Sequence, residues 1–384
     1  MIKEIDKQYV APTYNRFDVE LVSGKGSIFV DVNGKEYIDL GSGIGVTAFG
    51  ACDEKWTEAV CKQASLLQHT SNLYYTEPCA RLAQMLCEKT GFSKVFFSNS
   101  GAEANECAIK VARKYACEQK GSEYFTIITL NNSFHGRTLT TLAATGQEHF
   151  HTLFNPLTPG FVSIDASEET LEAAISKYKA AAVMIECVQG EGGVIPLSEE
   201  FVKAVRRLCD DHNLLMIVDE VQTGNGRCGE LYAYQCFGVT PDVVSTAKGL
   251  SGGLPLGATM LSKKVENVFS FGDHGSTFGG NPVCAAAAIS VLERLDREFL
   301  DSVQKKSKLI FDTLSGAEGI ISVTGKGLML GIKTQKPAAE VVKACLLDGV
   351  LCLTAKDKVR LLPALNIPCE TLKKALEIIK KNCK

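Results

Sequence analysis

The sequence predicts an α/β fold in which a large domain with a mainly parallel sheet, covered by helices, is joined to a smaller α+β domain. Apolar strand patterns separated by helical patterns run from about residue 55 onward, and this alternation is typical of a parallel sheet with helices on both faces. After about residue 300 the pattern changes to short strands among helices. A chain of 384 residues is also long for a single hydrophobic core.

The individual elements are predicted from turn residues and from the period of the apolar positions. Residues 27–40 predict a β-hairpin, because alternating apolar residues flank Asn33-Gly34, a dipeptide typical of two-residue turns. In the large domain we expect helices at 77–90, 102–119, 167–179 and 198–211, and strands at 94–97, 124–130, 181–188 and 214–219. Near the C-terminus we expect strands at 328–333 and 359–362 and helices at 338–347 and 370–381.

These elements divide the chain into three expected parts. Residues 1–50 carry the hairpin and are expected to pack with the small domain. Residues 51–285 are expected to form the large domain, and residues 286–384 the small C-terminal α+β domain.

Composition excludes several classes of protein. A net charge of −3 argues against nucleic acid or an anionic membrane surface as the main partner. No run approaches the ~20 apolar residues that span a bilayer, and the N-terminus lacks the apolar region of a secretion signal. The fifteen cysteines show no Cys-x-x-Cys spacing, which favours buried thiols in a reducing cytoplasm. We expect no metal site, because the histidines also lack ligand spacing.

Lys248 is the only charged residue between Val243 and Ser262. Burial of an ammonium group costs free energy and lowers its pKa, which makes the nucleophilic neutral amine accessible. A lysine at the mouth of a loop, with its amine in water, is the alternative. Asp219 ends the apolar strand that precedes this segment, and a carboxylate so close to an isolated lysine indicates a cofactor that needs both.

A phosphate site is predicted where the strand at 94–97 ends. The segment Ser-Asn-Ser-Gly-Ala-Glu-Ala-Asn, residues 98–105, opens the following helix, and free backbone N–H groups at a helix N-terminus bind anions. Helix capping explains Ser100 equally well. The Gly-rich polar loop at 272–282 could complete a phosphate cradle.

Arg137 is a second isolated charge, since no other Asp, Glu, Lys or Arg lies between Glu123 and Glu148. Its partner is either a substrate carboxylate or an acid from a distant segment. Glu186 follows another strand of the expected sheet, as Asp219 does. Ligands of open α/β sheets bind at the carboxyl ends of the strands, so we expect these side chains to lie near one another.

Pyridoxal phosphate explains this set of residues. The cofactor needs a lysine for its aldehyde, a carboxylate that keeps the ring nitrogen protonated, an aromatic side chain over the ring, and an anion cradle for its phosphate. Lys248, Asp219, Phe134 and the turn at 100–102 supply these groups. Phe134 alone would be interpreted as a core residue.

The chain resembles the class III aminotransferases, which belong to the fold type I pyridoxal-phosphate superfamily, along nearly its whole length. The segments that carry the resemblance are Ser-Gly-Ala-Glu-Ala-Asn at 100–105, Phe-His-Gly-Arg-Thr at 134–138, Glu-Cys-Val-Gln-Gly-Glu-Gly-Gly at 186–193, Asp-Glu-Val-Gln-Thr-Gly at 219–224, Ala-Lys-Gly-Leu at 247–250 and His-Gly-Ser-Thr-Phe-Gly-Gly-Asn-Pro at 274–282. Segments 42–46 and 71–74 favour the subgroup that acts on acetylornithine. Residues 50–55 depart from the family, which usually has a His-x-x-Pro element there.

The resemblance implies a set of cofactor-binding residues: Ser100, Gly101, Ala102, Phe134, Asp219, Glu220, Val221, Gln222, Lys248 and Thr277. Gly101 and Ala102 would bind the phosphate through backbone amides, and Phe134 would stack on the ring. Asp219 would pair with the ring nitrogen, and Gln222 would lie near the ring hydroxyl. Thr277 would reach the cofactor phosphate of the neighbouring subunit, so the resemblance implies an obligate homodimer.

The substrate-binding residues that the resemblance implies are Arg137, Glu186, Ser276 and Arg360. Arg137 would bind the α-carboxylate of acetylornithine and later the distal carboxylate of 2-oxoglutarate. Arg360 would bind the α-carboxylate of 2-oxoglutarate, and we expect it to pair with Glu186 while the amino donor is bound.

The implied reaction is a transamination in arginine biosynthesis. The δ-amino group of N2-acetylornithine would pass to 2-oxoglutarate, giving N-acetylglutamate 5-semialdehyde and glutamate, with Lys248 and Asp219 as the catalytic residues. Other ω-amino donors remain alternatives, namely ornithine, succinylornithine, succinyl-diaminopimelate and 4-aminobutyrate, as does an aminomutase reaction. A non-catalytic relative is disfavoured because Lys248, Asp219 and Arg137 are all present.

Overall fold

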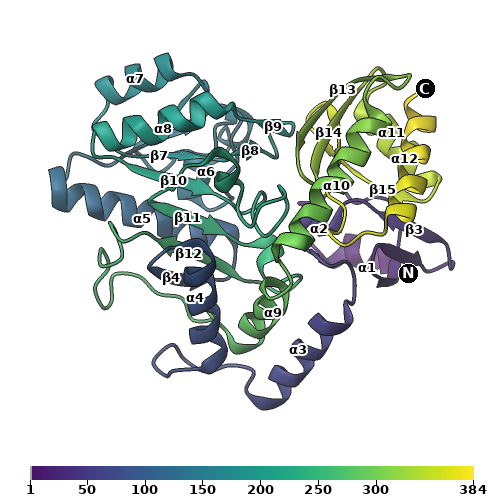
Figure 1. The fold of residues 1–384 in the computed structure, drawn as a ribbon, viewed down its shortest axis with the longest axis horizontal. Coiled ribbons are helices and arrows are strands. Elements are labelled where there is room, and N and C mark those ends of the chain that lie inside the picture. Colours follow the sequence, from purple (N-terminus) through teal and green to yellow (C-terminus); the bar gives the residue numbers. More distant parts are fainter. Residues whose placement is uncertain (1) are drawn as a thin grey trace.

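The structure, a computed structural model, describes residues 2–384 and has a large and a small lobe (Figure 1). The large lobe is built on a seven-stranded sheet, and both ends of the chain lie in the small lobe. The predicted α/β class with a mainly parallel sheet is confirmed.

The large sheet has the strand order β4-β12-β11-β10-β7-β5-β6. Its strands are β4 (Lys94–Ser98), β5 (Thr126–Leu130), β6 (Phe161–Ile164), β7 (Ala180–Ile185), β10 (Leu215–Asp219), β11 (Val243–Thr246) and β12 (Gly257–Leu261). β12 runs antiparallel to both of its neighbours, and the other strand pairs are parallel. The central strands β7 and β10 are buried along their whole length, which explains their continuous apolar sequences.

Helices cover both faces of this sheet. The helices of the large lobe are α3 (Glu54–Leu66), α4 (Glu77–Thr90), α5 (Gly101–Lys120), α6 (Leu139–Ala144), α7 (Glu168–Lys177), α8 (Glu199–Asp211) and α9 (Pro282–Leu292). Side chains alternate between the two faces of β10: Met216 and Val218 pack in the cluster that contains α8, whereas Leu215 and Ile217 pack in the cluster that contains α5. Figure 1 shows α7 and α8 above the sheet.

The small lobe contains two further sheets. One has the order β13-β14-β17-β16, and the other has the order β1-β2-β3-β15. Their strands are β1 (Leu21–Lys25), β2 (Ile28–Asp31), β3 (Glu36–Asp39), β13 (Ile320–Lys326), β14 (Met329–Thr334), β15 (Val350–Leu351), β16 (Leu353–Ala355) and β17 (Lys358–Leu361), and its helices are α10 (Arg297–Leu314), α11 (Ala338–Leu347) and α12 (Cys369–Cys383). The expected hairpin is present as β2 and β3, and β3 pairs in parallel with β15, which joins the N-terminal segment to the small lobe. The boundaries at residues 50 and 285 stay a prediction.

Short elements complete the chain. They are α1 (Ile2–Tyr9), the turn α2 (Ser42–Gly45), the hairpin of β8 (Val188–Gln189) and β9 (Ile195–Pro196), and the 3₁₀ segments η1 (Glu148–Phe150), η2 (Ala233–Phe237) and η3 (Lys248–Leu250). The strand expected at 181–188 is shorter in the structure: β7 ends at Ile185, and Val188 belongs to the separate β8–β9 hairpin. This bend places the intervening Glu186 at the edge of the sheet.

Within residues 2–384, no helix combines the length and the apolar character that crossing a membrane requires. In the same part of the chain, no group of three or more His, Cys, Asp or Glu side chains could hold a metal ion, and all fifteen cysteines are free thiols.

Candidate active site

A cavity of about 630 Å³ opens at the carboxyl ends of the central strands. β7, β10 and β11 are neighbours in the sheet, and the residues that follow or end them are Glu186, Asp219 and Lys248. The edge predicted from the sequence is therefore the edge where the cavity lies. The predicted site residues that line it are Ser100, Gly101, Ala102, Phe134, Arg137, Glu186, Asp219, Val221, Gln222 and Lys248.

Lys248 lies in the turn after β11, with a positive φ of 43°. Asn225 holds this turn, because its side-chain amide donates to Thr246 Oγ1 at 3.0 Å and to the carbonyl of Ala247 at 3.2 Å. Burial lowers the pKa of Lys248, against the opposing effect of Asp219 and two nearby glutamates. The structure therefore favours a partly buried amine in the cavity lining over a lysine with its head in bulk water.

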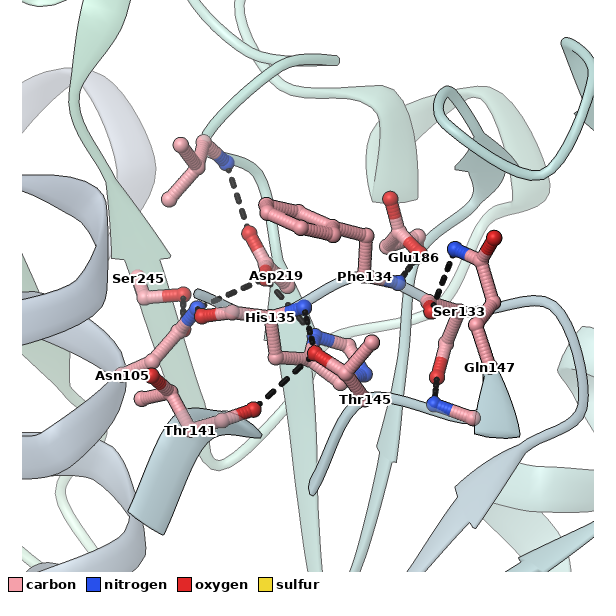
Figure 2. Close-up of polar contacts among 12 residues, drawn as sticks. Asn105, Ser133, Phe134, His135, Thr141, Thr145, Gln147, Glu186, Asp219 and Ser245 are labelled. Carbon is pink, nitrogen blue, oxygen red and sulfur yellow. Dashed lines mark hydrogen bonds and ion pairs between the residues drawn. The ribbon is translucent and has the colours of Figure 1, made fainter. Parts of the chain in front are cut away.

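Asp219 is 3% exposed and accepts hydrogen bonds on both carboxylate oxygens (Figure 2). Its Oδ2 accepts from Asn105 Nδ2 and from His135 Nδ1, each at 2.8 Å. Among the described residues, its Oδ1 accepts only from the backbone amide of Val221, at 3.0 Å. One oxygen is therefore held by two side chains, and the other keeps capacity for a ligand in the cavity.

The N-terminus of α5 supplies free amides. Ser100 caps this helix and accepts from the amide of Glu103, whereas within residues 2–384 the amides of Gly101 and Ala102 have no acceptor. A Cβ at Gly101 would lie 2.5 Å from the side chain of Val221. Gly136, at φ 141°, lies so close to α5 that a Cβ there would come within 2.9 Å of Ala102. Because these glycines have no side chain, backbone N–H groups can lie directly at the cavity, where they could bind a phosphate.

Arg137 has an exposed guanidinium that forms no ion pair with any acid in the described part of the chain. It lies instead over two aromatic rings, 4.3 Å from the centroid of Phe150 and 5.5 Å from that of Phe134. Cation–π contacts hold the side chain without using its N–H donors in the guanidinium plane. The expectation that its partner lies outside the chain is consistent with this geometry.

Arg360 was expected to pair with Glu186, but in the structure it pairs with Glu191. Arg360 Nη1 donates to Glu191 Oε1 and, at 3.4 Å, to Gln222 Oε1, which places it beside the cavity rather than in its lining. Burial raises the pKa of Glu186 above its usual range, as does Asp219, and its Oε2 accepts from the amide of Phe134 at 2.9 Å. Glu191 extends from the β8–β9 turn, and the charge of Arg360 overcomes burial and lowers its pKa.

Ser276 and Thr277 also lie outside the cavity lining. Ser276 contacts a residue of the lining, because Asn99 lines the cavity and its Nδ2 donates to Ser276 Oγ at 3.1 Å. Thr277 is exposed on the loop that precedes α9. The structure therefore does not bring Thr277 to the site of its own chain.

Comparison with known proteins decides the family of this chain. The family model described as Aminotransferase class-III matches residues 9–383. The chain belongs to this family. A curated relative from Haemophilus ducreyi, named acetylornithine aminotransferase, is 48% identical over 98% of this chain and 97% of its own length. Another from Methanocaldococcus jannaschii, with the same name, is 45% identical over 96% of this chain and 94% of its own.

Solved structures of class III aminotransferases have the same fold. An ornithine aminotransferase from Toxoplasma gondii has a TM-score of 0.95 at 33% identity and covers 100% of this chain and 94% of its own. An N-acetylornithine aminotransferase from Stenotrophomonas maltophilia has a TM-score of 0.86 at 36% identity and covers 99% of this chain and 97% of its own.

Class III aminotransferases use pyridoxal 5′-phosphate, and the residues of this cavity fit that cofactor. The free amides of α5 suit its phosphate, and the buried carboxylate of Asp219 suits a protonated ring nitrogen. The desolvated amine of Lys248 suits its aldehyde. The sequence predicts which donors and acceptors are present, and the structure gives the distances between them.

Sequence reasoning missed some residues of this class III aminotransferase site. Tyr14, from the N-terminal segment, lines the cavity, as do Asn105 and His135, which were quoted within motifs but given no role. A signal for Asn105 exists in the sequence, since a polar amide faces inward among the small apolar residues of α5. Nothing in the local pattern indicates that Tyr14 reaches the cavity.

Glu220 was predicted to bind the cofactor, but it does not line the cavity. Successive side chains of a strand point to opposite faces, so Asp219 faces the cavity and Glu220 faces away from it. Glu220 is fully buried, where Thr223 Oγ1 donates to it at 2.5 Å and the amide of Tyr234 donates to it at 2.8 Å. Burial raises its pKa to about 7.

Glu220→Gln is expected to remove part of the pH dependence of folding. The pKa of Glu220 is higher in the folded chain than the value of ~4.3 in an unfolded chain. Its contribution to the free energy of unfolding is therefore largest below pH ~4.3 and is lost as the pH rises to about 7. Between pH 4.5 and 7.5 the wild type should lose on the order of 3 kcal/mol of unfolding free energy relative to Glu220→Gln. Urea denaturation at both pH values measures this difference, with the exposed Glu172→Gln as control. Equal pH slopes for wild type and Glu220→Gln would show that folding does not raise the pKa of Glu220.

Proposed function

We propose that this class III aminotransferase transfers the δ-amino group of N2-acetyl-L-ornithine to 2-oxoglutarate, giving N-acetyl-L-glutamate 5-semialdehyde and L-glutamate in arginine biosynthesis. Curated relatives named acetylornithine aminotransferase, 40–48% identical over nearly the whole chain, support this proposal. The structural observation that carries it is the environment of Arg137, a free guanidinium beside aromatic rings. An acylated α-nitrogen bears no charge and needs no acid there, whereas the adjacent carboxylate needs a cation.

The cofactor would be held by residues from three segments of the large lobe. The amides of Gly101 and Ala102 would bind its phosphate, Phe134 would cover the ring, and Asp219 Oδ1 would accept from the protonated ring nitrogen. When bound, pyridoxal phosphate supplies an aldehyde that binds amines covalently and a ring that withdraws electrons. Gln222 lines the same wall and would lie near the ring hydroxyl.

Lys248 would move the proton of the reaction. Burial lowers its pKa and so favours the neutral amine, and a neutral amine can accept a proton from the substrate carbon. The resulting ammonium would be able to give the proton back, so the same nitrogen would act as base and as acid. Asp219, Glu186 and Glu191 favour the transient positive charge.

The ion pair of Arg360 and Glu191 would distinguish the two substrates. Acetylornithine carries a single carboxylate, for which Arg137 is available, and Arg360 stays neutralised by Glu191. 2-Oxoglutarate carries a second carboxylate, which would displace Glu191 and bind Arg360. Glu191, and not Glu186, is therefore proposed as the residue that covers Arg360 while the amino donor is bound.

A panel of amino donors tests the proposed substrate. The purified enzyme is assayed with 2-oxoglutarate and with acetylornithine, ornithine, succinylornithine, succinyl-diaminopimelate or 4-aminobutyrate, and kcat/KM is measured for each. We expect kcat/KM for acetylornithine, or for another donor acylated on its α-nitrogen, to exceed that for ornithine by about tenfold or more, because the α-ammonium of ornithine would lie beside the Arg137 cation without an acid to pair with it. A higher kcat/KM for ornithine would contradict the proposal.

Ornithine is the second candidate, because solved ornithine aminotransferases share this fold with a TM-score of 0.95. The α-ammonium of ornithine would require an acid beside Arg137. Among the described residues, no Asp or Glu forms an ion pair with that guanidinium.

A homodimer is part of the proposal, together with a cytoplasmic location. Two adjacent segments expose large apolar side chains, namely Leu66, Leu73, Tyr74, Tyr75, Phe271 and Phe278. The segments touch, because Asn72 Nδ2 donates to the carbonyls of Ser276 and Gly279 at 3.0 and 2.9 Å. Exposed apolar side chains on two touching segments support an interface with a second chain, and Thr277 belongs to one of these segments.

Thr277→Val is expected to weaken cofactor binding although Thr277 lies outside the cavity of its own chain. If its hydroxyl donates to the phosphate of the partner's cofactor, its loss should raise the dissociation constant of pyridoxal phosphate by about tenfold or more. Fluorescence titration of the cofactor-free protein measures this constant, and the exposed Thr240→Val serves as control. A wild-type protein that sediments as a monomer, or an unchanged constant for Thr277→Val, would contradict this role.

A further inference from the structure

Asn105 is a buried amide that connects four elements of the active site. It lies in α5, is 1% exposed, and its Nδ2 donates to Asp219 Oδ2 at 2.8 Å and to the backbone carbonyl of His135 at 2.7 Å. Its Oδ1 accepts from Ser245 Oγ at 2.5 Å. Figure 2 shows this chain of contacts, in which Asn105 lies between Ser245 and Asp219.

Ser245 determines which way the amide of Asn105 faces. Ser245 and Asp219 are direct neighbours across the parallel strands β11 and β10. The Ser245 hydroxyl donates to Asn105 Oδ1 and thereby leaves the NH₂ group for the carboxylate. The opposite orientation would place the amide oxygen against the carboxylate of Asp219, two acceptors without a proton between them. Both hydrogen bonds of this series therefore run in one direction: Ser245 donates to Asn105, and Asn105 donates to Asp219.

The groups that hold Asp219 leave its negative charge uncompensated. Of these hydrogen-bond donors, His135 is the one that could carry a positive charge. Its Nε2 is buried and has no hydrogen-bond partner among the described residues. A protonated imidazole would bury an unsatisfied N–H there, whereas the neutral tautomer with its proton on Nδ1 leaves only an unused acceptor. Neutral donors from Asn105 and His135 thus stabilise the carboxylate without cancelling its charge.

We propose that Asn105, oriented by Ser245, is a positioning residue that fixes the orientation of the Asp219 carboxylate, with Oδ1 turned to the cavity. Two donors on Oδ2 prevent rotation of the carboxylate, and Oδ1 retains a lone pair beside its single contact with the Val221 amide. This inference rests on the proposed function, in which Oδ1 accepts from the protonated ring nitrogen of pyridoxal phosphate.

Asn105→Leu and Ser245→Ala test the proposal in the full-length enzyme. Asn105→Leu removes both donors at similar volume, and we expect the dissociation constant of pyridoxal phosphate to rise about tenfold or more. Ser245→Ala frees the amide of Asn105 to turn, so a smaller rise in the same direction is expected. kcat should fall in both variants while KM for acetylornithine stays near the wild-type value, because Arg137 is untouched. The fluorescence of Trp56, the single tryptophan, whose Nε1 donates to the carbonyl of Ser251 beside the cavity, reports cofactor binding without turnover.

Thr259→Val is the matched control, because it removes a buried hydrogen bond to the same helix one residue from Asn105. Thr259 Oγ1 donates to the carbonyl of Ala104 at 2.8 Å and does not touch Asp219. We expect this variant to melt at a lower temperature but to bind the cofactor as the wild type does. An equal loss of affinity in Thr259→Val would assign the effect to helix packing and overturn the proposal.

The outcomes separate this inference from the proposed function. If Asn105→Leu does not fold, Ser245→Ala decides, because it removes only one oxygen atom. Wild-type affinity and kcat in both Asn105→Leu and Ser245→Ala would overturn the inference, while wild-type turnover of acetylornithine would still support the function. Failure of the wild-type protein to bind pyridoxal phosphate would overturn both.

Discussion

Lys248→Ala is expected to abolish sustained turnover. The variant loses the amine that would bind the cofactor covalently and the group that would move the proton between the substrate and cofactor carbons. Loss of a general base and acid alone costs about 10²–10⁴-fold in rate, and the loss of covalent attachment adds to this. Glutamate production with acetylornithine and 2-oxoglutarate, followed over many enzyme equivalents, measures the effect.

Lys263→Ala is the control for this experiment. Lys263 follows β12 and is highly exposed, and its amine pairs only with Glu266. Its removal changes the charge of the chain by the same amount, and activity should be unaffected. Repeated turnovers by Lys248→Ala, at any rate above that of the free cofactor in solution, would remove Lys248 from the mechanism.

Asp219→Asn is expected to bind pyridoxal phosphate poorly and to lose most of the rate. The substitution preserves volume but removes the negative charge that would keep the ring nitrogen protonated. It also introduces a mismatch, because Asn105 and His135 donate to Oδ2 and the Val221 amide donates to Oδ1, whereas an amide side chain has an acceptor at only one of these two positions. Cofactor content after dialysis and kcat measure the two effects.

Asp242→Asn is the matched control for Asp219→Asn. Asp242 is a buried carboxylate at the opposite end of the same sheet, where it accepts from the amide of Met216 and from Arg206. Its loss should lower the melting temperature without loss of cofactor. Activity near the wild-type level for Asp219→Asn would mean that the ring nitrogen has another partner.

The fold could be predicted where the local pattern is strong. The helix expected at 77–90 is present as α4 with the same bounds, and the strand expected to end at Asp219 does so. β11 and β12 were not predicted, and the position of an antiparallel strand inside a parallel sheet depends on pairing between distant segments, which a local pattern does not show.

The candidate site could be predicted in part from isolated charges. Lys248 and Arg137 lack acidic neighbours in the sequence, and in the described structure neither forms an ion pair. The choice between Glu186 and Glu191 as the partner of Arg360 could not be made from sequence. The two glutamates are five residues apart, and the bend after β7 and the β8–β9 turn decide which one faces β17.

Transfer of an isotope tests the central claim most directly. Acetylornithine labelled with ¹⁵N at the δ-amino group is incubated with the enzyme and unlabelled 2-oxoglutarate, and the products are analysed by mass spectrometry. The proposed reaction predicts that glutamate carries the label in amounts equal to the semialdehyde formed. Labelled nitrogen that stays in an isomer of the donor, or repeated turnovers without 2-oxoglutarate, would contradict it.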